Sequence, residues 1–167
     1  MASTPIVSFS EGEVAYAVNQ YSEKSADEAI EFINLQMNSK EPRQVRWAMF
    51  YLSKFKVERA IPIFLQHLDY QYTTVPVLTE AFPALQALIQ MGKPAASAAL
   101  QALTTESDAQ RLELLCQVVL GIDSLNVGKR RIETLVENTK DAQQRQKINA
   151  ALAKAVQSHA APNPPAT

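Results

Sequence analysis

Residues 64–68 read FLQHL, and steps of 35 residues reach AIEFI at 29–33 in one direction and ALQAL at 99–103 in the other. A further step of 35 residues reaches TLVEN at 134–138. The apolar pairs of these stretches are Ile30 and Ile33, Leu65 and Leu68, and Leu100 and Leu103, and in the last stretch Leu135 is followed by Asn138. A spacing of three places each pair on one helical face. The recurrence predicts one helix type repeated four times.

A second set of apolar positions recurs between these stretches. Its members are spaced i, i+3, i+7 and i+10, which places them on one helical face. The sets are separated by steps of 33, 34 and 33 residues: Val45, Ala48, Leu52 and Phe55; Leu78, Ala81, Leu85 and Leu88; Leu112, Leu115, Val119 and Ile122; Arg145, Ile148, Leu152 and Ala155. Two alternating helix types predict an all-α fold, an α-solenoid of about four helix pairs. The last pair turns polar because no further pair covers it.

Capping signals give the expected helix boundaries. Ser25 and Ser107 are each followed three positions later by Glu or Gln, as in a capping box. Gly92 and Gly121 follow long periodic segments and suit helix C-caps. These signals predict helices at about 11–21, 26–37, 42–55, 57–69, 75–91, 93–104, 107–121, 125–138 and 141–157.

Composition divides the chain into three parts. We expect an N-terminal extension over residues 1–10 and one helical domain over 11–157, whose first helix caps the stack. The segment 158–167 combines proline with small residues, so we expect a disordered tail. A chain of 167 residues is large enough for one domain that buries roughly two-thirds of its unfolded surface.

The charge balance argues against several classes of ligand. The sequence contains sixteen Lys and Arg residues and seventeen Asp and Glu residues, which gives a net charge of −1. Proteins that bind nucleic-acid phosphates usually carry a basic surplus, so we do not expect nucleic acid as the ligand. No stretch approaches the ~18–20 apolar residues of a membrane span, and no signal-peptide pattern is present. We expect a cytoplasmic protein that does not bind membranes, or an exported one if a signal peptide has been removed.

Residues capable of catalysis are few. Cys116 is the single cysteine and lies in the apolar run LLCQVV, which predicts a buried and inert thiol. The two histidines, His67 and His159, form no metal-ligand grouping with it, and a zinc site needs three or more converging ligands. A phosphate-binding glycine loop and a nucleophile elbow are also missing from the sequence. We therefore expect no metal, no cofactor and no enzymatic activity.

The repeats resemble the HEAT-repeat family, especially its short bacterial branch with PBS-lyase-like repeats. The segment ERAIPIFLQHLD at 58–69 is similar to the family's first helix with its turn Asp, QVRWA at 44–48 to its Val-Arg step, and GKPAA at 92–96 to its entry into a first helix. The resemblance covers about residues 25–157 and implies second helices that line a concave face. It departs from the family at the long turn after Asp69 and at Glu113, which stands where Arg46 stands in the first repeat.

The concave face is the expected binding surface, because solenoids usually bind ligands there. In the first repeat this face combines cationic with aromatic side chains, which are over-represented in binding centres. The candidate contact residues on this face are Arg43, Arg46, Trp47, Phe50, Lys54, Glu80, Gln90, Glu113 and Gln117. Tyr70 and Tyr72, in the turn after Asp69, are further candidates because long loops with aromatic tips often make contacts.

Each candidate has a structural alternative. Trp47, Phe50 and Tyr51 either form a binding site or pack into the core, against the expected helix at 11–21. One tyrosine of the turn either contacts a ligand or folds over the core edge. The run KRR at 129–131 is either a solvated charge cluster or an anion-binding patch.

We expect a non-catalytic scaffold or adaptor that holds a protein or peptide segment on its concave face. Two alternatives remain open. One is a nucleic-acid-binding protein similar to the DNA glycosylases with HEAT-like repeats, whose groove should be basic and aromatic. The other is a subunit similar to tetrapyrrole lyases or chaperones, which rests on fold analogy alone. The pattern does not specify the oligomeric state or the partner.

Overall fold

Helices make up all the regular secondary structure in the part of the chain that the computed structural model describes, residues 21–36, 42–74 and 77–160. The expected all-α class is therefore confirmed for these residues. The N-terminal extension and nearly all of the expected helix at 11–21 lie outside them. None of the described helices combines the length and apolarity that crossing a membrane requires.

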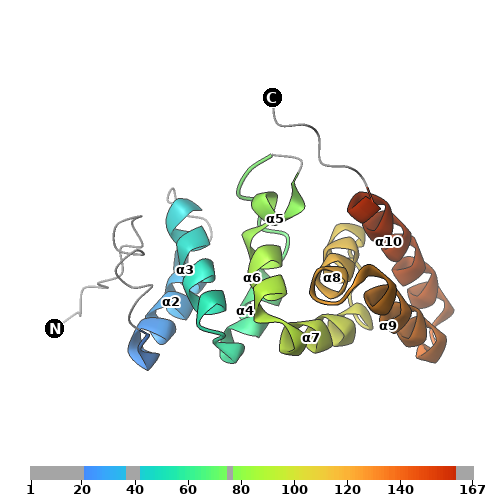
Figure 1. The fold of residues 1–167 in the computed structure, drawn as a ribbon, viewed down its shortest axis with the longest axis horizontal. Helices are drawn as coiled ribbons and strands as arrows, with labels where there is room; N and C mark the ends of the chain where they lie inside the picture. The colour runs from blue at the N-terminus through green and yellow to red at the C-terminus, as the bar shows by residue number, and fades with distance from the viewer. Residues whose placement is uncertain (1–20, 37–41, 75–76, 161–167) are drawn as a thin grey trace.

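The helices follow one another in chain order along the long axis of the molecule, from α2 at one end to α10 at the other (Figure 1). They are α2 (Glu23–Gln36), α3 (Pro42–Lys54), the 3-10 turn η1 (Glu58–Ala60), α4 (Ile61–Gln66), α5 (Leu78–Ala81), α6 (Pro83–Met91), α7 (Lys93–Leu103), α8 (Ala109–Ile122), α9 (Leu125–Asn138) and α10 (Ala142–Ala160). Helix α2 packs on α3, α4 on α6, α7 on α8, and α9 on α10. Helices α3, α6, α8 and α10 also contact one another in succession.

The segment expected as one helix over 75–91 is divided into α5 and α6. The break falls at Phe82, whose φ of −118° and ψ of 92° are extended. Phe82 precedes Pro83, and a proline ring disfavours the α conformation of the residue before it. Proline also lacks the N–H that would continue the helix. Pro83 therefore starts a new helix.

Two helices begin at caps that the sequence patterns misplace. The Ser22 hydroxyl accepts the backbone N–H of Ser25 at 3.1 Å, so Ser22 rather than Ser25 caps α2. The Asp108 carboxylate accepts the backbone N–H of Arg111 at 2.9 Å, so Asp108 rather than Ser107 caps α8. A carboxylate suits this position because it also faces the positive end of the helix dipole.

The far ends of the helices differ from expectation in two places. Gly92 has a φ of 78° between α6 and α7, as expected of a helix-ending glycine. Gly121 lies inside α8, which continues to Ile122, so its expected role as a C-cap is wrong. A Cβ atom at Gly121 would lie 2.6 Å from Cδ1 of Ile89, so this glycine permits the close approach of α6 and α8. Helix α10 runs to Ala160, three residues beyond the expected boundary, and 161–167 lie outside the described residues.

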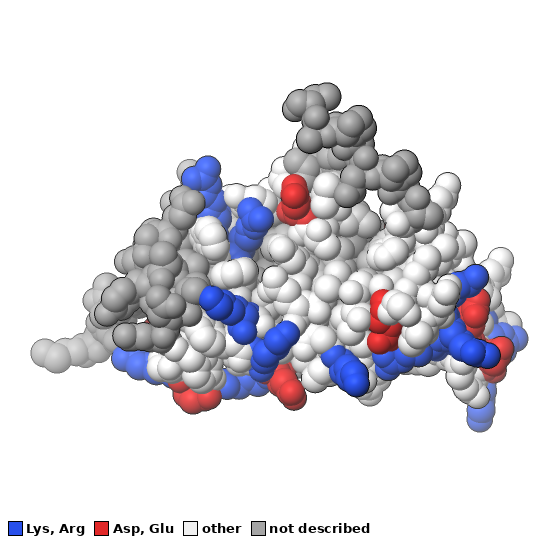
Figure 2. Space-filling view, viewed as in Figure 1, with Lys and Arg blue, Asp and Glu red and all other residues white. Residues whose placement is uncertain are grey.

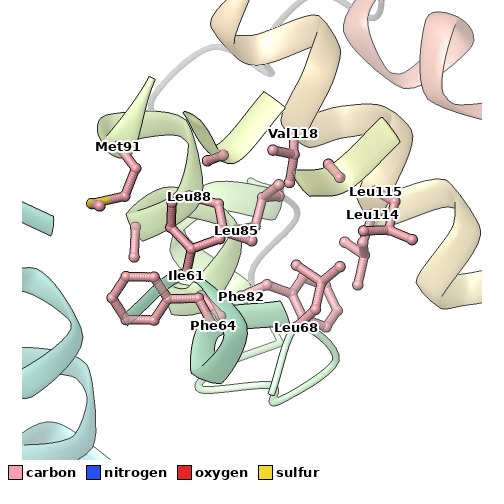
Figure 3. Close-up of a cluster of buried hydrophobic side chains, with 14 of the residues drawn as sticks. Ile61, Phe64, Leu68, Phe82, Leu85, Leu88, Met91, Leu114, Leu115 and Val118 are labelled. Atoms are coloured by element: carbon pink, nitrogen blue, oxygen red, sulfur yellow. The ribbon is translucent and has the colours of Figure 1, made fainter. Parts of the chain in front are cut away.

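The second apolar register forms the centre of the core. Its members Leu52, Leu85 and Val119 are fully buried. Figure 3 shows how side chains from three helices meet there: Ile61, Phe64 and Leu68 from α4 and the turn after it, Leu85, Leu88 and Met91 from α6, and Leu114, Leu115 and Val118 from α8. The first register is less uniform, because Leu65 and Leu100 are only half-buried and pack at the margin of the core.

Arg111, in the first turn of α8, ties this helix to the end of α4. Its guanidinium donates to the carbonyl oxygens of Leu65 at 2.7 Å and Gln66 at 3.3 Å. The same group pairs with the carboxylates of Asp69 at 2.7 Å and Glu106 at 2.8 Å. The last carbonyls of a helix have no partner within it, and a cation suits the negative end of its dipole. Arg111 therefore completes α4 from the next helix pair.

Gln144 repeats this arrangement one pair later, 33 positions after Arg111. Its amide nitrogen donates to the carbonyl oxygens of Leu103, at the end of α7, at 2.7 Å and of Glu106 at 2.8 Å. In two successive helix pairs, a polar side chain at the start of the second helix thus donates to the last carbonyl oxygens of the first helix in the preceding pair.

Core truncations should separate the two registers. Leu85→Ala removes a side chain that is 1% exposed, and we expect it to lower the free energy of unfolding by ~2–5 kcal/mol. Leu100→Ala should lower it by roughly half as much, because the half-buried Leu100 loses fewer contacts. Urea denaturation followed by circular dichroism measures both. Equal losses, or a loss below ~1 kcal/mol for Leu85→Ala, would contradict this core.

Candidate functional site

A groove of about 280 Å³ lies between α3 and α6, and we call it the α3–α6 groove. Its lining residues are Arg46, Trp47, Phe50 and Ser53 from α3, and Pro83, Gln86, Ala87 and Gln90 from α6. Four of the predicted contact residues, Arg46, Trp47, Phe50 and Gln90, therefore meet in one groove. The register also assigns Pro83 and Ala87 to the concave side of the second repeat, and the position of α6 against α3 adds Gln86.

The aromatic side chains of α3 divide between the core and the groove. Val45, Ala48 and Leu52 occupy the buried face of this helix, which turns Trp47 and Phe50 toward the groove, both half-buried. Their rings meet edge to face with centroids 5.8 Å apart, a favourable arrangement. Tyr51 is instead fully buried, with its ring 5.0 Å from that of Phe55, so it belongs to the core.

Arg46 joins the groove to the turn that follows α4. Its guanidinium carbon lies 5.0 Å from the centroid of the Tyr72 ring, within the range of a cation–π contact. The backbone N–H of Tyr72 donates to the carbonyl oxygen of Ala81 at 2.7 Å, which fixes the turn against α5. Tyr70 packs against the core, where burial first, and then nearby Tyr72, raise the pKa of its hydroxyl. Tyr72 is thus the tyrosine of this turn that contacts a groove residue, Arg46, although it does not line the groove itself.

Polar side chains gather at the other end of the α3–α6 groove, around Gln90. The Ser53 hydroxyl donates to the side-chain oxygen of Gln90 at 2.7 Å. The Lys56 ammonium donates to the backbone carbonyl of Gln90. An open extension at this end is lined by Phe50, Ser53, Lys54, Lys56 and Gln90. The groove therefore runs from a guanidinium at Arg46 to two ammonium groups.

The charged side chains that line the α3–α6 groove and its extension are all cationic. Arg46, Lys54 and Lys56 line the groove and its extension, and none of the described lining residues is acidic. Figure 2 shows Lys and Arg gathered over α3, a largely uncharged surface over α6, and an acidic side chain over α5. A negatively charged ligand segment would meet no repulsion in the groove itself.

The remaining predicted contact residues lie elsewhere. Gln117 is only 6% exposed, and its amide nitrogen donates to the carbonyl oxygen of Ala155 at 3.0 Å. Its expected role as a contact residue is wrong, because it ties α8 to α10. Arg43 is exposed at the start of α3 and Glu80 on α5, while Glu113 is half-exposed on α8. None of these three lines the α3–α6 groove.

A second groove, of about 200 Å³, lies between α8 and α10, and we call it the α8–α10 groove. Its lining residues are Ser107, Ala109, Leu112, Lys147, Ala150, Ala151 and Lys154. The register assigns Lys147 and Lys154, which lie seven residues apart on one helical face, to the concave side of the fourth repeat. The structure adds the start of α8 and the alanines of α10.

Two of the three basic residues at 129–131 form ion pairs with acidic residues of α9 or of the turn before it. Lys129 lies 3.7 Å from the carboxylate of Glu133, and Arg131 lies 2.6 Å from that of Asp123. These pairs favour the solvated charge cluster over an anion-binding patch, because surface ion pairs of this kind are common and weak.

Comparisons with known proteins assign no family to the chain. No family model matches it, and no curated protein and no solved structure matches it either. The resemblance to HEAT repeats therefore rests on the sequence pattern, and the two grooves carry the functional argument.

The residues considered for catalysis are placed in the core or beside it. Cys116 is fully buried, and its burial, with a smaller contribution from Glu113, raises the pKa of the thiol to about 12. A protonated, enclosed thiol is a poor nucleophile. Within the described residues, no three His, Cys, Asp or Glu side chains are grouped so as to hold a metal ion.

His67 lies directly after α4, beside the carboxylate of Asp69 and the guanidinium of Arg111. Its Nε2 atom is buried and has no hydrogen-bond partner among the described residues. Burial lowers the pKa of the imidazole, and Arg111 lowers it further, while Asp69 acts in the opposite direction. The folded environment therefore favours the neutral form of the His67 imidazole.

The Cys116 thiol should report unfolding rather than surface chemistry. We expect no reaction with the chromogenic disulfide DTNB in the native protein and one thiol per chain in guanidinium chloride, because only unfolding exposes the sulfur. The absorbance of the released thiolate measures both. Fast reaction of the native protein would show that α8 is not enclosed.

His67 should make stability fall in mild acid. The folded pKa lies below the ordinary value of 6.5. As pH falls below 6.5, the unfolded chain therefore binds the proton first, and the free energy of unfolding decreases by at most ~1.4 kcal/mol per pH unit. Urea denaturation at pH 7.5, 6 and 5 tests this. His67→Phe should flatten the dependence, whereas the control His159→Phe, at the exposed end of α10, should retain it. An unchanged slope in His67→Phe would refute the assignment.

Proposed function

We propose that the chain is a non-catalytic adaptor of the HEAT-repeat type, which binds a segment of another protein in the α3–α6 groove. Three features support the repeat architecture. Two apolar registers share one period, the helices pack in consecutive pairs, and α3, α6, α8 and α10 contact one another in succession. Arg111 and Gln144 add a polar link at equivalent positions of successive pairs.

The observation that carries the binding proposal is the composition of the α3–α6 groove. Trp47 and Phe50 offer partly exposed rings beside the guanidinium of Arg46. Trp, Tyr and Arg are the residues that most often dominate binding energy at protein interfaces. Burial of a partner's apolar side chain against these rings would supply the affinity, and Arg46 would orient a neighbouring carboxylate.

The size of the groove favours a peptide over a small molecule. Small-molecule sites usually enclose ~300–1,000 Å³ and most of the ligand surface. The α3–α6 groove holds about 280 Å³ and opens along its length, with an extension past Lys54 and Lys56. A groove of this form receives one or two side chains of a longer segment.

A nucleic-acid ligand is the competing proposal, because aromatic rings and cations also stack and neutralise single strands. The net charge of −1 opposes a long phosphate backbone, as does the exposed Glu80 on α5, outside the groove lining. Phosphate contacts would make affinity fall steeply with salt, and binding of single-stranded oligonucleotides with such a dependence would favour this reading instead.

The single tryptophan makes the proposal directly testable. Trp47 is the only Trp in the chain, so its fluorescence reports the groove alone. We expect peptides selected against the protein from a display library to change this emission. Arg46→Ala should weaken their binding about thirtyfold, the equivalent of ~2 kcal/mol, as should Trp47→Ala when binding is followed by the anisotropy of a labelled peptide.

The matched control is Arg130→Ala, which removes an exposed cation from α9. It should leave affinity unchanged, and all three variants should retain the native circular dichroism spectrum. Full affinity in both Arg46→Ala and Trp47→Ala would overturn the proposal. Unfolding of Trp47→Ala together with full affinity of Arg46→Ala would place the aromatic pair in the core.

A further inference from the structure

We propose that the ligand of the α3–α6 groove is an acidic, extended segment with two apolar anchors, the second of which binds in the α8–α10 groove. This inference rests on the proposed function and specifies the chemistry and the length of the partner segment. It follows from the lining of the second groove, from the repeat register that relates the two grooves, and from the distance between neighbouring helices.

The α8–α10 groove also combines apolar and cationic side chains, with aliphatic residues in place of the aromatic rings of the first groove. Leu112, Ala150 and Ala151 give it an apolar floor. Lys147 and Lys154 stand on its rim, both exposed. None of the described lining residues is acidic. A small apolar side chain flanked by carboxylates fits such a groove, because the floor removes it from water while the lysines pair with the charge.

The repeat register places the two grooves on the same side of the molecule. Successive second helices are offset by 33, 34 and 33 residues, which together relate positions 100 residues apart on α3 and α10. Lys147 therefore occupies the position of Trp47, Ala150 that of Phe50, and Lys154 that of Lys54. Helices α3 and α10 thus turn equivalent faces to the two grooves, whereas α8 contributes Leu112 and the residues at its start. A chain that follows these faces across the second helices passes over both grooves.

The spacing of the helices sets the distance between the anchors. Packed helices lie ~8–10 Å apart, and the centres of the two grooves are separated by two such intervals, roughly 16–20 Å. An extended chain advances ~3.3 Å per residue, so roughly five or six residues connect the anchors. A segment crossing the helices thus needs to be only about ten residues long to reach both grooves.

Helix α8, which forms the nearer wall of the second groove, restricts the residues that connect the anchors. Glu113, half-exposed on α8, occupies in the register the position that Arg46 holds on α3. A carboxylate of the ligand next to Glu113 would be repelled, since like charges in close contact are unfavourable. The segment is therefore acidic at both anchors and neutral or basic between them.

Synthetic peptides test this arrangement with the intact chain. Each carries one or two Glu-Leu-Glu anchors, and the paired anchors are joined directly or through Gly-Ser spacers of about three or twelve residues. Affinity is measured by fluorescence anisotropy of a labelled peptide and by Trp47 emission. We expect the three-residue spacer, which sets the two leucines ~20 Å apart, to bind at least tenfold more tightly than the single anchor, because the second contact is intramolecular. The directly joined anchors, whose leucines lie ~10 Å apart, cannot reach both grooves, and the twelve-residue spacer should gain less.

The double variant Lys147→Glu with Lys154→Glu should abolish the gain from the second anchor and leave the affinity for the single anchor unchanged. Lys147→Ala with Lys154→Ala should reduce the gain, which guards against an effect of the introduced charges on folding. Arg130→Glu, on α9, is the control and should change neither affinity. A second control replaces the spacer's central residues by Glu, which should weaken binding of the paired anchors.

The outcomes separate this inference from the proposed function. If the single anchor changes Trp47 emission but the spacer length and the lysine variants have no effect, the second site is wrong and the first groove stands. If none of these acidic peptides binds, the inference is overturned, while the proposed function is still decided by the display-selected peptides. If Trp47→Ala and Arg46→Ala both leave the binding of every peptide unchanged, both are overturned. A complex with two protein chains per peptide, seen by sedimentation, would also overturn the inference, because the anchors would then bind different copies.

Discussion

Helix α8 is apolar on nearly every side, and the positions of its neighbours follow from the need to cover it. Leu112, Leu115, Val119 and the intervening Cys116 and Val118 are all buried. A helix at the surface buries only one stripe of its side chains, so a helix that is apolar on nearly every side must be covered on nearly every side. Helices α6, α7, α9 and α10 all contact it. Each neighbour covers one side of α8 and turns its own outer face to water, which produces the row of helices in Figure 1.

Apolar burial alone does not fix how far one helix pair slides along the next. The polar links made by Arg111 and Gln144 supply that restriction, because each reaches specific carbonyl oxygens in the preceding pair. Helix α4 depends on this most, since six residues are too few for a stable isolated helix. The buried side chain of Phe64 anchors α4 in the core. Arg111, which is paired with the carboxylate of Asp69, donates to the carbonyl oxygens at the end of α4. The α8–α10 groove lies between the two helix pairs that Gln144 joins.

The α3–α6 groove exists because the two helices present side chains of unequal size. Trp47 and Phe50 on α3 stand opposite Pro83 and Ala87 on α6, whose short side chains leave space between the helix axes. The core behind them is fully packed, so the groove cannot close without disturbing Leu52 and its neighbours. The α8–α10 groove arises in the same way from the alanines of α10. In both, cations remain at the rim because burial of a charge without a partner is unfavourable.

The sequence by itself determined the helical class, most helix boundaries and the buried stripe of each second helix. It did so because a period of 3.6 residues marks which face of a helix is apolar, as at Leu85 and Val119. Prediction failed where the answer depended on a neighbouring helix. The register assigns Gln117 to an exposed position, but α10 covers it. Arg111 binds carbonyl oxygens of residues that are far from it in the sequence. The contact of Tyr72 with Arg46 belongs to the same class. Periodicity reports what a helix face requires, and only the tertiary structure decides which side chain meets that requirement.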